Sequence, residues 1–228
     1  MSNLKIITGH FGSGKTEFSL NYAMILAKTE ATYLVDMDII NPYFRSRELY
    51  GPLERAGVKL IADSFGQAQY SIDLPALPSS IYGLVSKTKE NIVFDVGGDP
   101  SGARVLGRYA NLIKERDSYD MYMVVNANRP LTMEAGQVVR LIGQIEETSC
   151  LKINGLVNNT HMLRETTVED MLKGRELCVE VGHALSIPLV FNVCLRSLNL
   201  GINRPILEKL PILEDLFEID LMLRPDWL

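Results

Sequence analysis

Short apolar stretches rich in β-branched and aromatic residues alternate along the chain with longer amphipathic stretches. Such nearly continuous apolar runs are typical of strands that are covered on both faces of a sheet. They lie at residues 4–8, 31–37, 58–62, 91–96, 119–127, 152–159 and 187–193, and the clearest helical spacing lies at 14–28, 133–147 and 168–185. The alternation predicts an α/β fold, a three-layer sandwich with a mainly parallel sheet of about seven strands and helices on both faces.

No internal repeat or low-complexity linker interrupts this pattern, so a single domain over residues 1–228 is expected. Residues 62–80 are less regular and contain two prolines, which predicts a surface excursion before a helix near 80–88. The tail from Pro205 carries six acids and two bases, which disfavours binding to an anionic membrane surface. Its apolar residues have helical spacing and are expected to dock onto the domain or a second copy: Ile212, Leu213, Leu216 and Phe217.

The first predicted strand leads directly into a glycine-rich loop. Residues 5–18 read KIITGHFGSGKTEF, and Gly9-x-x-x-x-Gly14-Lys15-Thr16 is the spacing of a phosphate-binding loop. Glycines let backbone N–H groups approach phosphate oxygens, and the following helix directs its positive end at the same anion. Lys15 supplies charge to the β- and γ-phosphates, and the Thr16 hydroxyl is a hard ligand for Mg²⁺. The expected nucleotide-binding residues in this loop are Gly9, Gly12, Ser13, Gly14, Lys15, Thr16 and Glu17.

A carboxylate ends the fourth apolar stretch, in NIVFDVGGDPSG. Asp95 is followed by Gly97 and Gly98, which is the Walker B arrangement. In that arrangement the carboxylate holds Mg²⁺ through water, and a glycine offers its N–H to the γ-phosphate. The spacing Asp95-x-x-Gly98 is also that of the γ-phosphate switch in GTPases. Asp95 is therefore a metal candidate and Gly98 a nucleotide-binding candidate.

Two acids separated by one residue, Asp36 and Asp38, end the second apolar stretch. At the carboxyl end of a parallel strand, such side chains point into the ligand crevice of an α/β sheet. One can join the water shell of the magnesium ion while the other orients the attacking water. The alternative is that one of them caps the next helix.

In their order, these motifs resemble those of the MinD/ParA/CobQ-like nucleotide-binding proteins, which are SIMIBI-type P-loop NTPases. The resemblance spans roughly residues 4–195 and rests on the Walker A loop, the V-D-x-D near residue 36 with a following proline, and Asp95 with its diglycine. It implies that Lys15 acts in catalysis, that Asp38 positions the hydrolytic water, and that two protomers face each other across ATP. Asp36 is then a metal candidate together with Thr16 and Asp95.

One position departs from that family. Many members carry a lysine directly after the first glycine of the loop, where it reaches the phosphates of the second protomer. Here the residue is His10, whose neutral imidazole does not supply a constant charge. The arginines that could replace it are Arg45, Arg47, Arg104 and Arg129. The segment GHFGSGKT also resembles the loop of the nickel-insertion GTPases of hydrogenase and urease, which makes a metallochaperone-type GTPase the alternative function.

The stretch NGLVNNTHM after the sixth predicted strand bears on the choice of base. Its residues 158–161, Asn-Asn-Thr-His, lack the lysine and aspartate of N-K-x-D, the guanine-reading motif of GTPases. An asparagine amide can both donate to and accept from adenine, and the segment resembles the adenine-binding asparagine of MinD-like and iron-protein relatives. ATP is therefore the expected nucleotide. Asn159 is the preferred base-binding residue, although either Asn158 or Asn159 can instead cap the following turn.

Composition and charge narrow the class of protein. A net charge of −5 and a pI near 5.3 argue against intrinsic nucleic-acid binding. The apolar runs are too short for a signal peptide or a membrane span, so a cytoplasmic protein is expected. Cys150, Cys178 and Cys194 lie far apart without a C-x-x-C pair, which indicates buried thiols rather than a disulfide framework.

These features together predict a Mg²⁺-dependent ATPase, slow without a partner, that switches a protein partner and forms a homodimer. A third alternative is an ATP-dependent small-molecule ligase or kinase related to the cobyrinate amidases and dethiobiotin synthetase. Such an enzyme needs substrate-binding residues beyond the nucleotide site, and residues 62–80 are the evident place for them.

Overall fold

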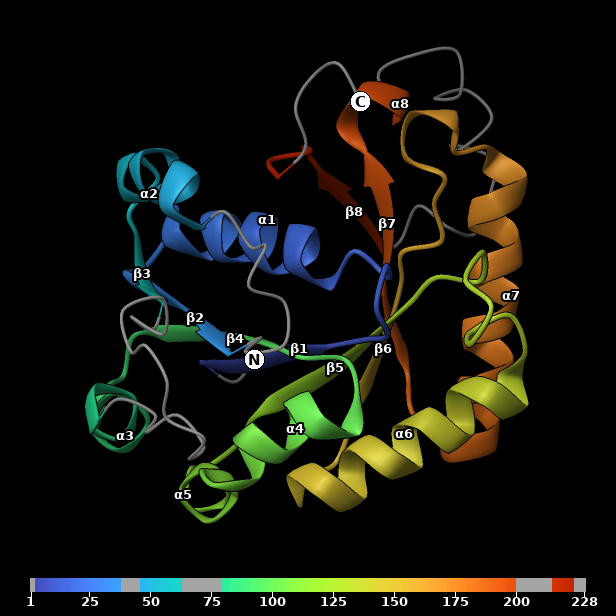
Figure 1. Cartoon of the computed structure of the whole chain (residues 1–228). Coiled ribbons are helices and arrows are strands. Elements are labelled where there is room, and N and C mark those ends of the chain that lie inside the picture. Colours follow the sequence, from blue (N-terminus) through green and yellow to red (C-terminus); the bar gives the residue numbers. More distant parts are fainter. Residues whose placement is uncertain (1–2, 38–45, 63–78, 200–214, 224–228) are drawn as a thin grey trace, which may run out of the picture.

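The structure is a computed structural model that describes residues 3–37, 46–62, 79–199 and 215–223 (Figure 1). Within these ranges, eight parallel strands form one sheet in the order β3-β2-β4-β1-β5-β6-β7-β8. The strands are β1 (Leu4–Thr8), β2 (Thr32–Met37), β3 (Val58–Ala62), β4 (Asn91–Val96), β5 (Asp120–Val125), β6 (Gly155–Asn158), β7 (Leu189–Leu195) and β8 (Leu216–Ile219). The predicted α/β sandwich with a parallel sheet is confirmed.

Helices cover both faces of the sheet (Figure 1). They are α1 (Lys15–Ala27), α2 (Ser46–Arg55), α3 (Ser79–Lys87), α4 (Pro100–Gly107), α5 (Ala110–Lys114), α6 (Ala135–Ser149), α7 (Val168–Leu185) and α8 (Arg196–Asn199), with a 3₁₀ turn η1 (Leu163–Glu165). One buried cluster packs α1 and α2 on the sheet, and a second packs α3 to α7 on the opposite face. Among the described helices, none combines the length and apolar character that a bilayer crossing requires.

The tail corrects one expectation. Residues 216–219 form the edge strand β8 instead of continuing a helix, and β8 pairs in parallel with β7. Its burial alternates, with Phe217 and Ile219 buried and Leu216 and Glu218 partly exposed, which is the period of a strand. Phe217 packs on Phe18 of α1 with ring centroids 5.0 Å apart. The tail therefore docks onto its own domain, as expected, but through sheet pairing; Ile212 and Leu213 lie outside the described residues.

Strand register brings the candidate site residues to one edge of the sheet. Asp95 of β4 is in register with Ile7 of β1 and with Asp36 of β2. Residues in register on neighbouring parallel strands share a face, and Asp36 and Asp95 lie on the same face as Leu34 and Val93, which pack under α1. Ligands of open α/β sheets bind at the carboxyl ends of the strands, so the fold places both carboxylates beside the loop after β1.

Two helix-interior glycines make a matched test of packing. A Cβ on Gly174 of α7 would lie 2.0 Å from Thr160 Oγ1 and 2.1 Å from Asn158 Oδ1, whereas a Cβ on Gly143 of α6 would meet nothing within 4 Å. We expect Gly174→Ala to lower the free energy of unfolding by about 1–3 kcal/mol because of overpacking. Gly143→Ala should raise it by about 0.5–1 kcal/mol, since alanine favours a helix. Urea unfolding measures both, and equal effects of the two variants would contradict the packing.

Candidate functional site

The loop between β1 and α1 has the backbone that a phosphate-binding loop requires. Gly12 and Gly14 adopt left-handed φ angles of 78° and 79°, which side-chain-bearing residues rarely adopt. A Cβ on Gly9 would lie 2.4 Å from the Val124 carbonyl oxygen of β5, so this position also excludes a side chain. A hydrogen bond of 2.9 Å from Ser13 N–H to His10 O closes the turn. The glycine spacing seen in the sequence therefore matches a conformational need at each position.

Lys15 and Thr16 begin α1, directly after the loop. Lys15 is buried, with 8% of its surface exposed, and Thr16 is partly exposed at the pocket wall. One turn further on, Ser19 Oγ lies within hydrogen-bond distance of Lys15 O at 2.8 Å and Asp95 Oδ1 at 3.3 Å. Ser19 thus connects the first turn of α1 to the carboxylate of β4, and it is a site residue that sequence reasoning missed.

The carboxylates assigned to metal binding lie where the sequence placed them. Asp95 is 2% exposed, and Asp36 is half-buried beside it on β2. A buried carboxylate next to the start of α1, together with the Thr16 hydroxyl, offers hard oxygen donors of the kind that Mg²⁺ prefers. These residues therefore fit a magnesium ion bound with a nucleotide. Asp38 lies outside the described residues, so its assigned role stays a prediction.

The loop after β4 lies against the phosphate-binding loop. A Cβ on Gly98 would be only 1.6 Å from the Gly9 carbonyl oxygen, so the two backbones cross without space for a side chain. Thr8 Oγ1 lies 3.5 Å from Gly97 O on the same side. Asp99 then caps α4 by accepting the Gly102 N–H at 2.8 Å. The glycine that was assigned to the γ-phosphate is thus in direct backbone contact with the loop that would hold it.

The two asparagines after β6 have different environments. Asn158 Nδ2 donates to Met171 O at 2.9 Å and to Asn192 Oδ1 at 3.0 Å, so this amide joins β6 to α7 and β7. Asn159 instead lines the pocket, and its Nδ2 donates to Ser13 O at 2.8 Å. Asn159 is thus the asparagine that contacts the phosphate-binding loop. When the asparagine of N-K-x-D is aligned on Asn159 instead of Asn158, the aspartate position falls on Met162. Neither register contains the aspartate.

The four arginines named from the sequence are placed unequally. Arg129 Nε donates to Gly12 O at 3.1 Å, and its side chain lines the same pocket. Arg104 is exposed on α4, Arg45 lies outside the described residues, and the side chain of Arg47 is likewise not described. His10 is half-buried, with Nδ1 3.1 Å from Phe11 O. Among the described arginines of this group, Arg129 is therefore the one that contacts the phosphate-binding loop.

A pocket of about 370 Å³ extends from the loop toward the ends of β7 and β8. This volume lies in the range of small-molecule sites. One wall is polar and includes Lys15, Thr16, Arg129 and Asn159; the other is largely apolar and is formed by Leu163, Val193, Cys194, Leu195, Ile219, Leu221 and Leu223. Sequence reasoning missed the apolar wall, because its C-terminal residues are more than 200 positions from the loop and carry no motif.

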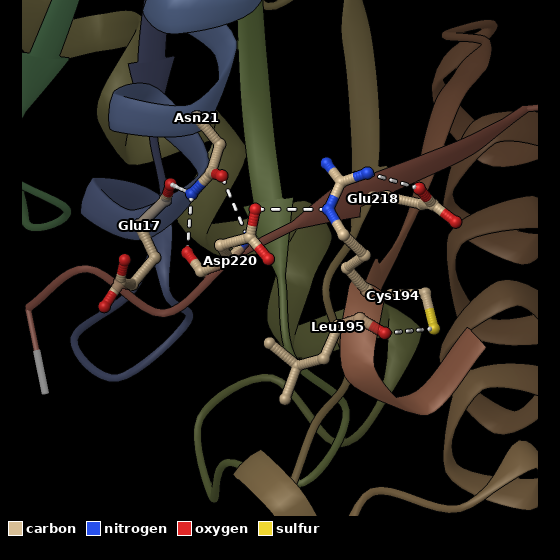
Figure 2. A network of polar contacts seen from close by, with 7 residues as sticks. Glu17, Asn21, Cys194, Leu195, Glu218 and Asp220 are labelled. Carbon is tan, nitrogen blue, oxygen red and sulfur yellow. Dashed lines mark hydrogen bonds and ion pairs between the residues drawn. The ribbon is translucent and has the colours of Figure 1, made fainter. Parts of the chain in front are cut away.

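Glu17 makes contacts that the sequence did not indicate, and its assignment to nucleotide binding stays a prediction. Its carboxylate accepts the N–H groups of Met222 at 3.0 Å and Leu223 at 2.9 Å. Figure 2 shows Glu17 and Asn21 on α1 beside Asp220, at the start of this C-terminal stretch. Glu17 lines the pocket, and these two hydrogen bonds hold part of its apolar wall. Within the described ranges, no group of three or more histidine, cysteine, aspartate or glutamate residues forms a metal-binding cluster.

Comparisons with known proteins address the fold. No protein-family model and no curated protein sequence matches the chain. Among solved structures, FtsY from Mycoplasma mycoides is similar with a TM-score of 0.55 and 15% identity, and the match covers 83% of this chain and 58% of that one. Chloroplast FtsY from Physcomitrella patens has a TM-score of 0.56 and 16% identity, with coverage of 84% and 58%. FlhF complexed with GMPPNP and Mg²⁺ has a TM-score of 0.50 and 14% identity, with coverage of 82% and 64%. The chain has the P-loop NTPase-like α/β fold of these structures.

This P-loop fold is what the similarity establishes, because sequence identity to these neighbours is low. The chain spans 58% of the length of the first two FtsY structures. The neighbours named above are FtsY and FlhF proteins, and they do not bear on the finer resemblance to the MinD/ParA/CobQ group. The predicted P-loop type of α/β fold is confirmed, and the identity of the base and of any partner has to be argued from the site residues.

The cysteines give a test of the pocket wall. Burial raises the pKa of Cys178 to about 12, and burial together with Glu218 raises the pKa of Cys194 to about 11, whereas Cys150 is exposed. A raised thiol pKa keeps the group protonated and unreactive. At about pH 8, we expect a colorimetric thiol reagent to modify one of the three cysteines in the folded protein and all three in denaturant. Rapid modification of Cys194 in the folded protein would contradict its burial in the pocket wall.

Proposed function

We propose that the chain binds Mg·ATP in this pocket, hydrolyses it slowly, and uses the nucleotide cycle to switch its contact with a protein partner. The observation that carries the proposal is the convergence of three strand ends. The phosphate-binding loop after β1, Asp95 at the end of β4 and Asn159 after β6 meet at one edge of the sheet. A nucleoside triphosphate needs these three parts together, namely backbone N–H donors, a site for Mg²⁺ and a residue at the base.

The phosphate end of the pocket concentrates positive charge. The N-terminus of α1 and Lys15 directly follow the loop, and both would stabilise an anion there. Arg129 adds a second cation from the same chain, at the loop glycine Gly12. We propose that Arg129 supplies in cis the charge that a lysine at the His10 position supplies in trans in MinD-like proteins. Thr16 and Asp95 would hold Mg²⁺, which would supply a positive charge to balance the charge that develops on the phosphate oxygens.

Hydrolysis requires a group that orients water, and we assign this role to Asp38. We expect Lys15→Ala to weaken Mg·ATP binding by roughly 10- to 100-fold, since hydrogen bonds to charged groups contribute about 1.5–3 kcal/mol. Asp38→Ala should bind normally and lose about 100-fold or more in turnover, which is the scale of general-base contributions. Calorimetry measures binding, and phosphate release measures turnover. Lys28→Ala, at the opposite end of α1, is the charge-matched control.

Unchanged hydrolysis in both the Lys15 and the Asp38 variants would remove the catalytic assignment.

The same pair of variants also tests whether the nucleotide controls contact with a protein partner. The Asp38→Ala protein, trapped with ATP, should retain a specific protein that the Lys15→Ala protein does not retain. Equal recovery by both variants would argue that the nucleotide does not control the contact, and would favour a small-molecule ligase or kinase.

The base is proposed to be adenine. Guanine recognition by N-K-x-D uses an aspartate, and the corresponding position is Met162 when the motif is aligned on Asn159. Glu17 is the carboxylate among the described residues that line the pocket, and both of its oxygens accept N–H groups of residues 222 and 223. An FlhF neighbour with the same fold is complexed with GMPPNP, which makes a GTPase the second candidate. Base choice follows side chains at the site rather than the fold.

A titration with both nucleotides decides between these candidates. We expect Mg·ATP to bind at least about tenfold more tightly than Mg·GTP, a difference of about 1.4 kcal/mol. Calorimetry of the wild-type chain with each nucleotide under the same buffer and salt provides the measurement. A preference for GTP would support the metallochaperone-type GTPase or an FtsY-like switch instead.

The surface around the pocket supports contact with another protein. Phe11 in the phosphate-binding loop is 75% exposed, and other exposed apolar side chains on adjoining loops are Leu131, Met133 and Met162. Exposed apolar groups gathered around a ligand site are typical of interaction surfaces. Because Gly98 touches the loop and leads into α4, binding of a γ-phosphate at this point can move a surface segment. A partner or a second copy of the chain would then detect the nucleotide state.

A further inference from the structure

The residues after β8 form a strap, Asp220–Leu223, that lies along α1 beside the pocket. β8 pairs with β7 up to Ile219, and beyond that point α1 side chains take over the backbone contacts. Asn21 and Asp220 exchange two hydrogen bonds of 2.9 Å through the Asn21 amide and the Asp220 backbone. Glu17 accepts the N–H groups of Met222 and Leu223. The strap is therefore held by two side chains of the helix that begins with Lys15 and Thr16.

Two ion pairs lie on the opposite side of the strap. Arg196, at the start of α8, pairs with Asp220 at 3.2 Å and with Glu218 at 3.0 Å. Figure 2 shows Asp220 between the α1 side chains and this ion-pair network, with Leu195 and Cys194 of β7 beneath it. The strap is thus held by hydrogen bonds to α1 on one side and by an ion pair to Arg196, which directly follows β7, on the other. This arrangement positions Leu221 and Leu223 in the pocket wall.

The position of Glu17 requires an explanation beyond helix formation. A carboxylate one residue after Thr16 would repel a bound triphosphate, although the N-terminal end of α1 compensates part of that cost. The carboxylate accepts hydrogen bonds from Met222 and Leu223, and these bonds hold the apolar end of the pocket in place. The polar end of the same pocket is the phosphate-binding loop. An apolar wall continuous with a phosphate site suits the flat face of a nucleobase.

We propose that the strap Asp220–Leu223 forms the nucleobase wall of the pocket and that Glu17 is the positioning residue that sets this wall against the base. The inference rests on the proposed nucleotide binding. Leu221 and Leu223 contact the face of the base, while Asn159 at the other wall is available to its polar edge. The affinity for the base therefore depends on Glu17, a side chain of the helix that follows the phosphate-binding loop. Contacts to the base and contacts to the phosphates can then be measured separately.

The test compares Mg·ATP with Mg·tripolyphosphate, a probe that has the phosphates and lacks the base. The variants are Glu17→Gln, which replaces one acceptor by a donor facing an N–H, and Leu223→Ala, which shortens the wall. We expect each variant to raise the ratio of the Kd for ATP to the Kd for tripolyphosphate by about tenfold, the scale of one or two lost apolar groups in a pocket. The ratio is the readout because Glu17→Gln also removes a negative charge that repels both probes alike. Glu176→Gln, an exposed residue of α7, is the charge-matched control.

The outcomes separate this inference from the function it rests on. An equal loss for ATP and tripolyphosphate would assign Glu17 to the phosphates, and no loss for either would remove the strap from the base site; both results overturn the inference while leaving nucleotide binding intact. A wild-type protein that binds neither probe would overturn the proposed function itself.

Hydrogen exchange in the wild-type chain gives a readout that needs no variant. ATP should slow exchange of the Met222 and Leu223 amides by at least about threefold more than tripolyphosphate does, because the base closes the wall over the Glu17 hydrogen bonds. Equal protection by the two probes would contradict the proposal.

Discussion

Two backbones cross at the carboxyl edge of the sheet, and the rest of the site depends on that crossing. Gly98 lies so close to the Gly9 carbonyl that a single Cβ would fall 1.6 Å from its oxygen. The two loops are therefore in contact, and neither can move toward the other. In the proposed site, a change at a γ-phosphate would be felt at this contact and, through Gly98, at the start of α4.

The same edge also concentrates opposing electrostatic demands. Asp36 and Asp95 share the α1 face, and Glu17 adds a third carboxylate in the first turn of that helix. A triphosphate would be repelled by such a set unless cations and dipoles outweigh it. Lys15, Arg129 and the N-terminus of α1 supply that balance, and Mg²⁺ would be shared between Thr16 and Asp95. In the proposed site, the carboxylates and the glycine-rich loop therefore have to be interpreted together.

The sequence predicted those parts of the fold that are encoded locally. Seven strands were recognisable because each is a buried apolar run, and the glycine positions followed from backbone geometry. β8 was not recognised, because its four residues continue a helical spacing set by Ile212 and Leu213 and its strand character comes only from pairing with β7. The choice between Asn158 and Asn159 likewise depends on tertiary contacts, since one amide joins α7 and the other the phosphate-binding loop. The strap was invisible for the same reason: Leu223 meets Glu17 across 206 positions.

The two ends of the pocket differ in what specifies them, and this difference bears on how the chain relates to its structural neighbours. The phosphate end is built from backbone N–H groups, glycines and a helix terminus, which many sequences can supply in this fold. The base end is built from side chains on loops and on a C-terminal strap, where chains of the same fold vary most. Similarity at 14–16% identity to FtsY and FlhF therefore shows the shared fold alone. It carries no weight at the proposed base end, where Met162 occupies the position of the guanine-reading aspartate when the motif is aligned on Asn159 and Glu17 holds the strap.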